Sequence, residues 1–446
     1  MPAPRSYLFV TFEGGGNVPP VLGVTRRLAA RGHGVRVLAE PCLRGAVEAA
    51  GARFIPFTRH FTREDRTQDL IGDSAARTPI GALRASLERV VFGPARIVAE
   101  ETGRAMEEER PGVVVADALL PGALVPAEAA GIPRVVLFHM PEYLPGPGRP
   151  ATGPGFLPRA DLAGRVRDGL MTRLMYRQFA AYLAPFNDAR RAFGLAPLRT
   201  ARELLGQFHT ADLRLIQTSR AFDFPITPPP PNVRYVGPVL DEPDWTGEWR
   251  NPWPEADARP LVVASLSATF QDQRGVLQRI IAALGALPVR GLVTLGPAMA
   301  GERFELPPNV VAVASAPHAQ LFPHAAALVT HAGHGTVMRA LAAGVPLLCL
   351  PMGRDQDDNA ARVFARGAGL RLRPSASPPR IAAALRRLLD DPAFRANAAR
   401  LGAIIRDDAA ADRAVAELEA VGRTQIKHES EETPVILRER PPRIPG

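Results

Sequence analysis

Residues 315–369 read SAPHAQLFPHAAALVTHAGHGTVMRALAAGVPLLCLPMGRDQDDNAARVFARGAG, and this stretch decides the fold. The apolar run Ala325–Val329 predicts a buried strand that enters a glycine-containing turn, and Val337–Ala343 predict a helix that leaves it. Glycines let the backbone approach a ligand, and the free N–H groups and positive dipole of a helix start favour a phosphate. A second strand, Val345–Leu350, leads into a polar loop whose side chains suit hydroxyl groups. The stretch therefore predicts a nucleotide-sugar site.

The same alternation of short apolar runs and helical segments covers most of the chain on both sides of a proline-dense segment. It predicts an α/β protein with two doubly wound parallel sheets. The expected strands are 7–12, 35–39, 113–116, 135–138 and 213–217 before that segment, and 261–265, 291–295, 310–314, 325–329 and 345–350 after it. We expect a first domain at residues 1–224, a stiff proline-rich linker at 225–255, a second domain at 256–421 and a polar tail at 422–446.

Several short motifs stand at fixed offsets in and around the quoted stretch. They are Pro317-His318, the turn from His331 to Gly335, Gly344-Val345-Pro346 and Asp355-Gln356. Together they resemble the donor-binding signature of family 1 glycosyltransferases, which include plant and bacterial UDP-sugar enzymes and antibiotic glycosyltransferases. The resemblance implies the GT-B fold, in which two Rossmann-like domains face each other across a cleft. It further implies that residues 1–224 form the acceptor-binding domain and residues 256–421 the donor-binding domain. It also implies inverting, metal-independent transfer from a TDP- or UDP-sugar to a hydrophobic natural product such as a polyketide or macrolide aglycone.

The resemblance assigns a donor-binding role to each matching residue. His331 and Ser267 match residues that contact the diphosphate, and Asp355 and Gln356 match the pair that reads sugar hydroxyls. The phosphate cradle matches Gly333, Gly335 and Thr336. The loop that stacks on or flanks the nucleobase matches Pro317 and His318.

The acceptor side departs from the family pattern. Family members usually carry Gly-His-x-x-Pro after the first strand, and the histidine is the general base with an aspartate as its partner. Here that position is Asn17, and an amide is not a useful proton acceptor. Asp117, at the end of a strand, matches the partner aspartate and is the preferred substitute base; Glu13 and His139 are further candidates.

Composition narrows the classes of partner. The formal net charge is +9, but the basic residues are scattered singly, which disfavours nucleic-acid binding. No apolar run reaches the ~18–20 residues of a membrane span, and the N-terminus does not resemble a signal peptide, so we expect a cytoplasmic protein. Cys42 and Cys349 read as buried free thiols, and no ligand spacing indicates a metal site or a resident cofactor. The sequence leaves homodimer formation open.

Three other functions remain compatible with the donor signature. A nucleotide-sugar epimerase and a lipid glycosyltransferase would keep the fold and change the reaction. A nucleotide-sugar-binding partner without catalytic activity would account for the altered base position. Turnover of the donor in the absence of any acceptor would favour the epimerase.

Overall fold

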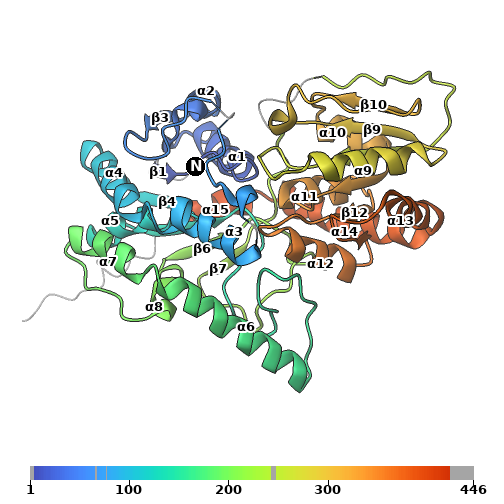
Figure 1. The fold of residues 1–446 in the computed structure, drawn as a ribbon. Coiled ribbons are helices and arrows are strands. Elements are labelled where there is room, and N and C mark those ends of the chain that lie inside the picture. The colour runs from blue at the N-terminus through green and yellow to red at the C-terminus, as the bar shows by residue number, and fades with distance from the viewer. Residues whose placement is uncertain (1–4, 66–67, 77, 243–247, 422–446) are drawn as a thin grey trace, which may run out of the picture.

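The computed structural model describes residues 5–65, 68–76, 78–242 and 248–421. The chain folds into two lobes, and each lobe is built on one parallel β-sheet with helices on both faces (Figure 1). We call them the first lobe, which holds the N-terminal sheet, and the second lobe. This architecture confirms the predicted fold class.

The first lobe contains a seven-stranded sheet in the order β3-β2-β1-β4-β5-β6-β7, with every neighbouring pair parallel. Its strands are short runs rich in Val, Leu, Ile and Phe, which suits strands covered on both faces. The strands are β1 Ser6–Val10, β2 Gly34–Ala39, β3 Arg53–Pro56, β4 Val113–Asp117, β5 Arg134–Phe138, β6 Leu213–Ile216 and β7 Val233–Tyr235. The helices are α1 Val18–Ala30, α2 Arg44–Ala49, α3 Pro79–Ser86, α4 Ala95–Glu108, α5 Leu124–Ala129, α6 Leu162–Ala180, α7 Leu183–Ala192 and α8 Ala201–His209.

The second lobe contains a six-stranded sheet in the order β10-β9-β8-β11-β12-β13, again parallel throughout. Its strands are β8 Leu261–Ser265, β9 Arg290–Thr294, β10 Val310–Val313, β11 Ala325–Thr330, β12 Leu347–Cys349 and β13 Gly369–Arg371. Its helices are α9 Arg274–Gly285, α10 His318–Leu321, α11 His334–Ala342, α12 Gln356–Ala365, α13 Pro378–Asp390 and α14 Pro392–Ala410. Cys349 is a buried thiol, as expected, whereas Cys42 is only partly buried.

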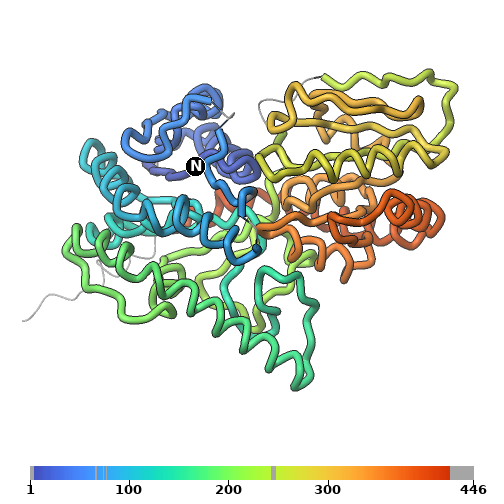
Figure 2. Tube along the Cα trace, viewed as in Figure 1, coloured from blue at the N-terminus to red at the C-terminus, as the bar shows by residue number. Residues whose placement is uncertain are grey.

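The last helix, α15 (Arg413–Ala420), leaves the second lobe and returns to the first (Figure 2). Its side chains Ala414, Val415 and Leu418 are buried in the same core cluster as residues of β1, α1 and β2. The Tyr7 hydroxyl of β1 donates a hydrogen bond to the Leu418 carbonyl at 3.2 Å. The first lobe is therefore completed by the C-terminal end of the described chain.

Three strands, β3, β7 and β13, were not expected from the sequence. β7 lies inside the segment that we interpreted as an interdomain linker, and it forms the edge of the first sheet. Proline removes ladder donors, so a proline-dense neighbourhood can supply an edge strand but hardly a central one. The predicted tail at 422–446 lies outside the described residues, and the exact domain limits remain a proposal.

Both sheets place their functional loops at the point where the strand order reverses. In the first sheet this point lies between β1 and β4, and in the second it lies between β8 and β11. Ligands of open α/β sheets bind at the carboxyl ends of strands at such points. A ligand is therefore expected to contact the loops that follow these four strands.

Candidate active site

The turn between β11 and α11 is built to expose the start of a helix. Helix α11 begins at His334, three residues earlier than the sequence predicted, so Gly335 and Thr336 belong to its first turn. Ala332 adopts a left-handed backbone, φ +70°, and a side chain on Gly333 would come within 2.4 Å of the His331 ring. The free N–H groups of this first turn form a site for an anion.

His331 is a neutral side chain in this turn. Burial, and to a smaller extent the positive charge of Arg354, together lower the pKa of His331 to about 3. At neutral pH the imidazole therefore carries no charge and keeps one donor and one acceptor nitrogen. Such a ring can donate a hydrogen bond to a phosphate oxygen.

Ser267 follows β8, the strand that pairs with β11. The side chain of Gln273 holds its backbone in place, because it accepts from the Ser267 N–H at 2.9 Å and donates to the Ser267 carbonyl at 2.8 Å. The Ser267 hydroxyl accepts from the Thr269 N–H at 3.1 Å and lies 3.0 Å from the Thr269 hydroxyl. Two hydroxyl groups are thus fixed at the strand end next to the glycine turn.

The Pro317-His318 pair begins helix α10, with Pro317 at the N-cap. The His318 ring stacks on Phe322, with ring centroids 4.2 Å apart, and its Nε2 lies 3.4 Å from the Ser265 hydroxyl. Burial is the main cause that lowers the His318 pKa to about 3. One face of this ring is therefore occupied from within the lobe.

Asp355 and Gln356 lie where β12 passes into α12. Asp355 caps the helix and accepts a hydrogen bond from the Asn359 side chain at 2.8 Å. Gln356 is buried: its Oε1 accepts from the Met352 N–H at 2.8 Å, and its Nε2 donates to Gln271 Oε1 at 2.8 Å. Gln356 keeps one further N–H and one further oxygen lone pair for a sugar hydroxyl, but its side chain is buried, whereas Asp355 is partly exposed.

On the opposite lobe, Asn17 precedes α1 and is 2% exposed. Its Nδ2 donates to Asp117 Oδ2 at 2.9 Å and to the Phe12 carbonyl at 2.8 Å, and its Oδ1 accepts from the Gly14 N–H at 3.0 Å. Asn17 thus contacts Asp117, the residue that in family members pairs with the histidine at this position.

Asp117 ends β4 and is buried among donors. Besides Asn17, its carboxylate accepts from the Leu119 N–H at 2.9 Å and from the Thr11 hydroxyl at 3.3 Å. His139, which follows β5, brings its Nδ1 to 3.6 Å from Asp117 Oδ1, and this nitrogen has no hydrogen-bond partner within the part of the chain that the structure describes. A histidine therefore does lie beside Asp117, but it follows β5 and not β1, where the family pattern has it.

Glu13 faces the turn that follows β1. Its Oε1 accepts from the Gly15 N–H at 2.6 Å, and its backbone N–H donates to Glu40 at 2.9 Å. A side chain on Gly15 would come within 2.7 Å of Thr269, so this turn touches the donor loop of the second lobe.

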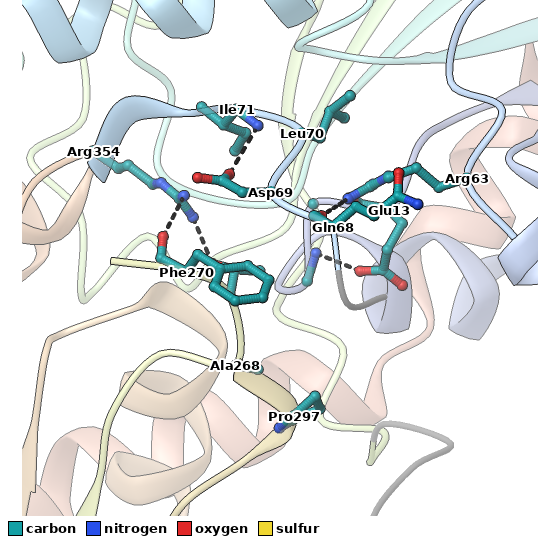
Figure 3. Close-up of a pocket in the computed structure, with 13 residues that line it drawn as sticks. Glu13, Arg63, Gln68, Asp69, Leu70, Ile71, Ala268, Phe270, Pro297 and Arg354 are labelled. Carbon is teal, nitrogen blue, oxygen red and sulfur yellow. Dashed lines mark hydrogen bonds between the residues drawn. The ribbon is translucent and has the colours of Figure 1, made fainter. Parts of the chain in front are cut away.

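Two pockets lie between the lobes. The first spans about 470 Å³ and is open to solvent (Figure 3). Its lining combines residues 13–15, Arg63 and residues 68–71 of the first lobe with residues 268–270, Pro297 and Arg354 of the second. The second pocket spans about 250 Å³ and is also open to solvent. The residues that line it are Gly16, Pro20, His139, Gln217, Pro238, Val239, His334, Gly335, Met338 and Arg339. The first turn of α11 and the candidate base His139 thus line one pocket.

Several residues of the cleft were missed by the sequence analysis. Arg354 forms an ion pair with Asp73 across the cleft, and His334 Nε2 lies 2.9 Å from the Thr218 hydroxyl of the first lobe. Arg354 directly precedes the predicted Asp355-Gln356 pair, and this adjacency in the sequence could have indicated that Arg354 lies at the donor site. Asp73 carries no comparable signal, because it begins a short 3₁₀ helix, Asp73–Ala75, that no sequence motif indicates.

The described part of the chain contains neither a cluster of metal ligands nor a membrane-spanning helix. Within residues 5–65, 68–76, 78–242 and 248–421, no group of three or more His, Cys, Asp or Glu side chains is placed to hold a metal ion. In those same ranges no helix is both long and apolar enough to cross a membrane.

Known proteins resemble this chain along nearly its whole length. Residues 278–421 match the family described as erythromycin biosynthesis protein CIII-like, C-terminal domain. The chain is 32% identical to 4'-demethylrebeccamycin synthase of Lentzea aerocolonigenes over 423 residues, which cover 92% of this chain and 97% of that protein. It is 28% identical to O-mycaminosyltylonolide 6-deoxyallosyltransferase of Streptomyces fradiae, over 93% and 97% of the two chains. The crystal structure of the glycosyltransferase VinC in complex with DTDP superposes with a TM-score of 0.63 at 22% identity, over 94% and 100% of the two chains.

Proposed function

The chain belongs to the GT-B glycosyltransferases of antibiotic biosynthesis, and from that premise we propose that it moves a sugar from a TDP- or UDP-sugar to a hydrophobic natural-product acceptor. The reaction is a single in-line displacement that inverts the anomeric carbon. The observation that carries this proposal is the pocket lined by both the first turn of α11 and His139. It sets an anion-binding helix start on one lobe against a candidate base on the other.

The donor occupies the second lobe in this proposal. The α11 start, His331 and Ser267 receive the diphosphate, and Asp355 and Gln356 read the sugar, as the family resemblance implies. The complex of VinC with DTDP supports a nucleoside diphosphate as the ligand, and the names of the relatives support a small-molecule acceptor. The positive end of α11 and fixed donors stabilise the leaving diphosphate, so the proposal includes no resident metal.

The acceptor proton goes to His139, with Asp117 as the group that orients it. Asp117 was the preferred base on sequence grounds, but its carboxylate already accepts three hydrogen bonds, so its oxygens are less accessible to an acceptor hydroxyl. A carboxylate 3.6 Å from Nδ1 favours the tautomer that leaves Nε2 free to accept a proton, and it stabilises the imidazolium that forms.

A transfer assay with mass detection tests the function. A panel of TDP- and UDP-sugars is offered with a panel of aromatic and macrocyclic aglycones, and a product heavier by one sugar is expected. Calorimetry on His331→Ala should show weaker binding of TDP or UDP, while Asp355→Ala should reduce discrimination between sugars. Unchanged behaviour of both variants would contradict the donor assignment, and donor turnover without an acceptor would point to an epimerase.

The base assignment is tested with His139→Gln. A general base is worth about 10²–10⁴-fold in rate, so kcat should fall within that range while the affinity for TDP or UDP stays nearly unchanged. Asp117→Asn should also lower kcat and alter the pH profile, because the tautomer of His139 is no longer fixed. Glu13→Gln serves as the comparison at the other candidate position. Near-normal turnover of His139→Gln across the pH range would refute the assignment.

A further inference from the structure

Arg354 joins the two lobes at the donor loop. It lies between β12 and α12, directly before Asp355, and its backbone is left-handed with φ +57°. Its Nη1 donates to the Thr269 hydroxyl at 2.7 Å. Its Nε and Nη2 donate to the two carboxylate oxygens of Asp73 in the first lobe, at 2.7 and 2.9 Å. One guanidinium therefore contacts a hydroxyl of the donor loop and a carboxylate across the cleft.

The positive charge of Arg354 acts within the predicted diphosphate site. Arg354 is the second cause, after burial, that lowers the pKa of His331. Thr269, which accepts from Arg354, also donates to Ser267 through its backbone N–H. The guanidinium is thus linked to both residues that are predicted to contact the diphosphate.

Two arginines line the first pocket, and their partners differ. Arg63 donates to Glu40 at 3.1 and 2.6 Å, and Glu40 belongs to the same lobe and is fully buried. Arg354 is bound to a residue of the opposite lobe, and its side chain is 20% exposed. A ligand that enters the cleft can therefore take the place of Asp73 more readily than that of Glu40. Figure 3 shows both arginines at the edge of this pocket.

We propose that Arg354 binds the diphosphate of the donor, and that Asp73 occupies its guanidinium when the donor is absent. The planar fork of arginine binds carboxylate and phosphate with the same bidentate geometry, so the two anions compete for the same N–H groups. Donor binding then breaks an ion pair between the lobes and is coupled to their relative movement. This inference rests on the proposed function, since it requires a nucleoside diphosphate donor.

Calorimetric titration with UDP and TDP separates this role from a purely structural ion pair. Arg354→Gln should weaken binding about 10–100-fold, because a charge-assisted hydrogen bond to the phosphate is lost. Asp73→Asn should instead tighten binding, because the competitor for the guanidinium is removed. In the double variant the gain from Asp73→Asn should vanish, which a double-mutant cycle measures directly.

Controls make the outcome decisive. Uridine and thymidine lack the diphosphate, so Arg354→Gln should not change their binding. Arg96→Gln, which removes an exposed arginine that pairs with Glu100 on α4, should leave all affinities unchanged. Equal weakening by Asp73→Asn and Arg354→Gln would overturn the inference and mark the pair as structural, as would unchanged binding in Arg354→Gln. If the wild-type protein binds neither diphosphate, the donor assignment itself fails; if it binds both and only Arg354→Gln is silent, this inference alone fails.

Discussion

Replacing Asn17 by alanine should destabilise the protein by about 3 kcal/mol. The change removes one charge-assisted hydrogen bond to Asp117, worth about 1.5–3 kcal/mol, and three neutral ones to residues 11, 12 and 14, worth about 0.5–1.5 kcal/mol each. The full sum is an upper bound, because the Phe12 carbonyl and the Gly14 N–H keep a 3.2 Å hydrogen bond to each other and Asp117 keeps two donors. No loss of helix capping is added, since the Asn17 side chain makes no capping hydrogen bond to α1.

Urea unfolding at pH 7, followed by circular dichroism, measures this loss. Asn187→Ala is the control, because Asn187 also forms two amide hydrogen bonds, to the backbone of Leu198, but lines neither pocket of the cleft. Asn187→Ala should lower stability and spare turnover, whereas Asn17→Ala should lower both. A loss below about 1 kcal/mol for Asn17→Ala would refute the reasoning, since it would show that water replaces the amide without penalty.

Three further outcomes are expected. Burial raises the pKa of Asp358 to about 6, so its contribution to stability is present at low pH and is lost as the pH rises through 6. Asp358→Asn keeps one acceptor oxygen and sets its amide NH2 against one of the two N–H groups of residues 153 and 155, so it should be less stable than wild type near pH 4. Because the variant carries no titrating carboxyl, its stability relative to wild type should rise by about 2–3 kcal/mol between pH 4 and pH 8, as thermal unfolding at both pH values would show. Asn17→His in a His139→Ala background should restore turnover, because it returns an imidazole to Asp117; steady-state kinetics would show no recovery if the proton is taken elsewhere. Turnover should persist in excess chelator, and a loss that added magnesium or manganese reverses would contradict the metal-independent reaction.

The sequence was most informative where backbone geometry depends on residue type. Glycines and apolar runs predicted the strand, turn and helix around His331, because only certain residues tolerate a tight turn at a helix start. The helix begins at His334, whereas the sequence predicted Val337. The prediction was late because the first turn of the helix holds polar residues and a glycine, which interrupt the apolar pattern. Boundaries of this kind depend on tertiary contacts that a local pattern does not contain.

Side-chain partnerships were much harder to predict. Gln356 matches a sugar-reading position, yet its amide is bound to Met352 and Gln271, because burial forces each polar atom to find a partner within the lobe. The approach of His139 to Asp117 depends on the adjacency of β4 and β5, which the strand order sets. The pair of Arg354 with Asp73 joins residues 281 positions apart, and nothing local relates them.

The return of α15 to the first lobe bears on how chimeras of such proteins should be built. A chimera with a single junction between the two sheets would supply α15 from the other parent. The first lobe would then lose its own Ala414, Val415 and Leu418, which are buried in its core. Val415 and Leu418 are fully buried, and a side chain of their size is worth about 1.5–3 kcal/mol when buried, so a mismatch there would endanger the folding of the half that was left untouched. Exchange of donor specificity between relatives therefore calls for two junctions, one before β8 and one ahead of Arg413, so that the transplanted segment is an insert and the recipient keeps its own last helix.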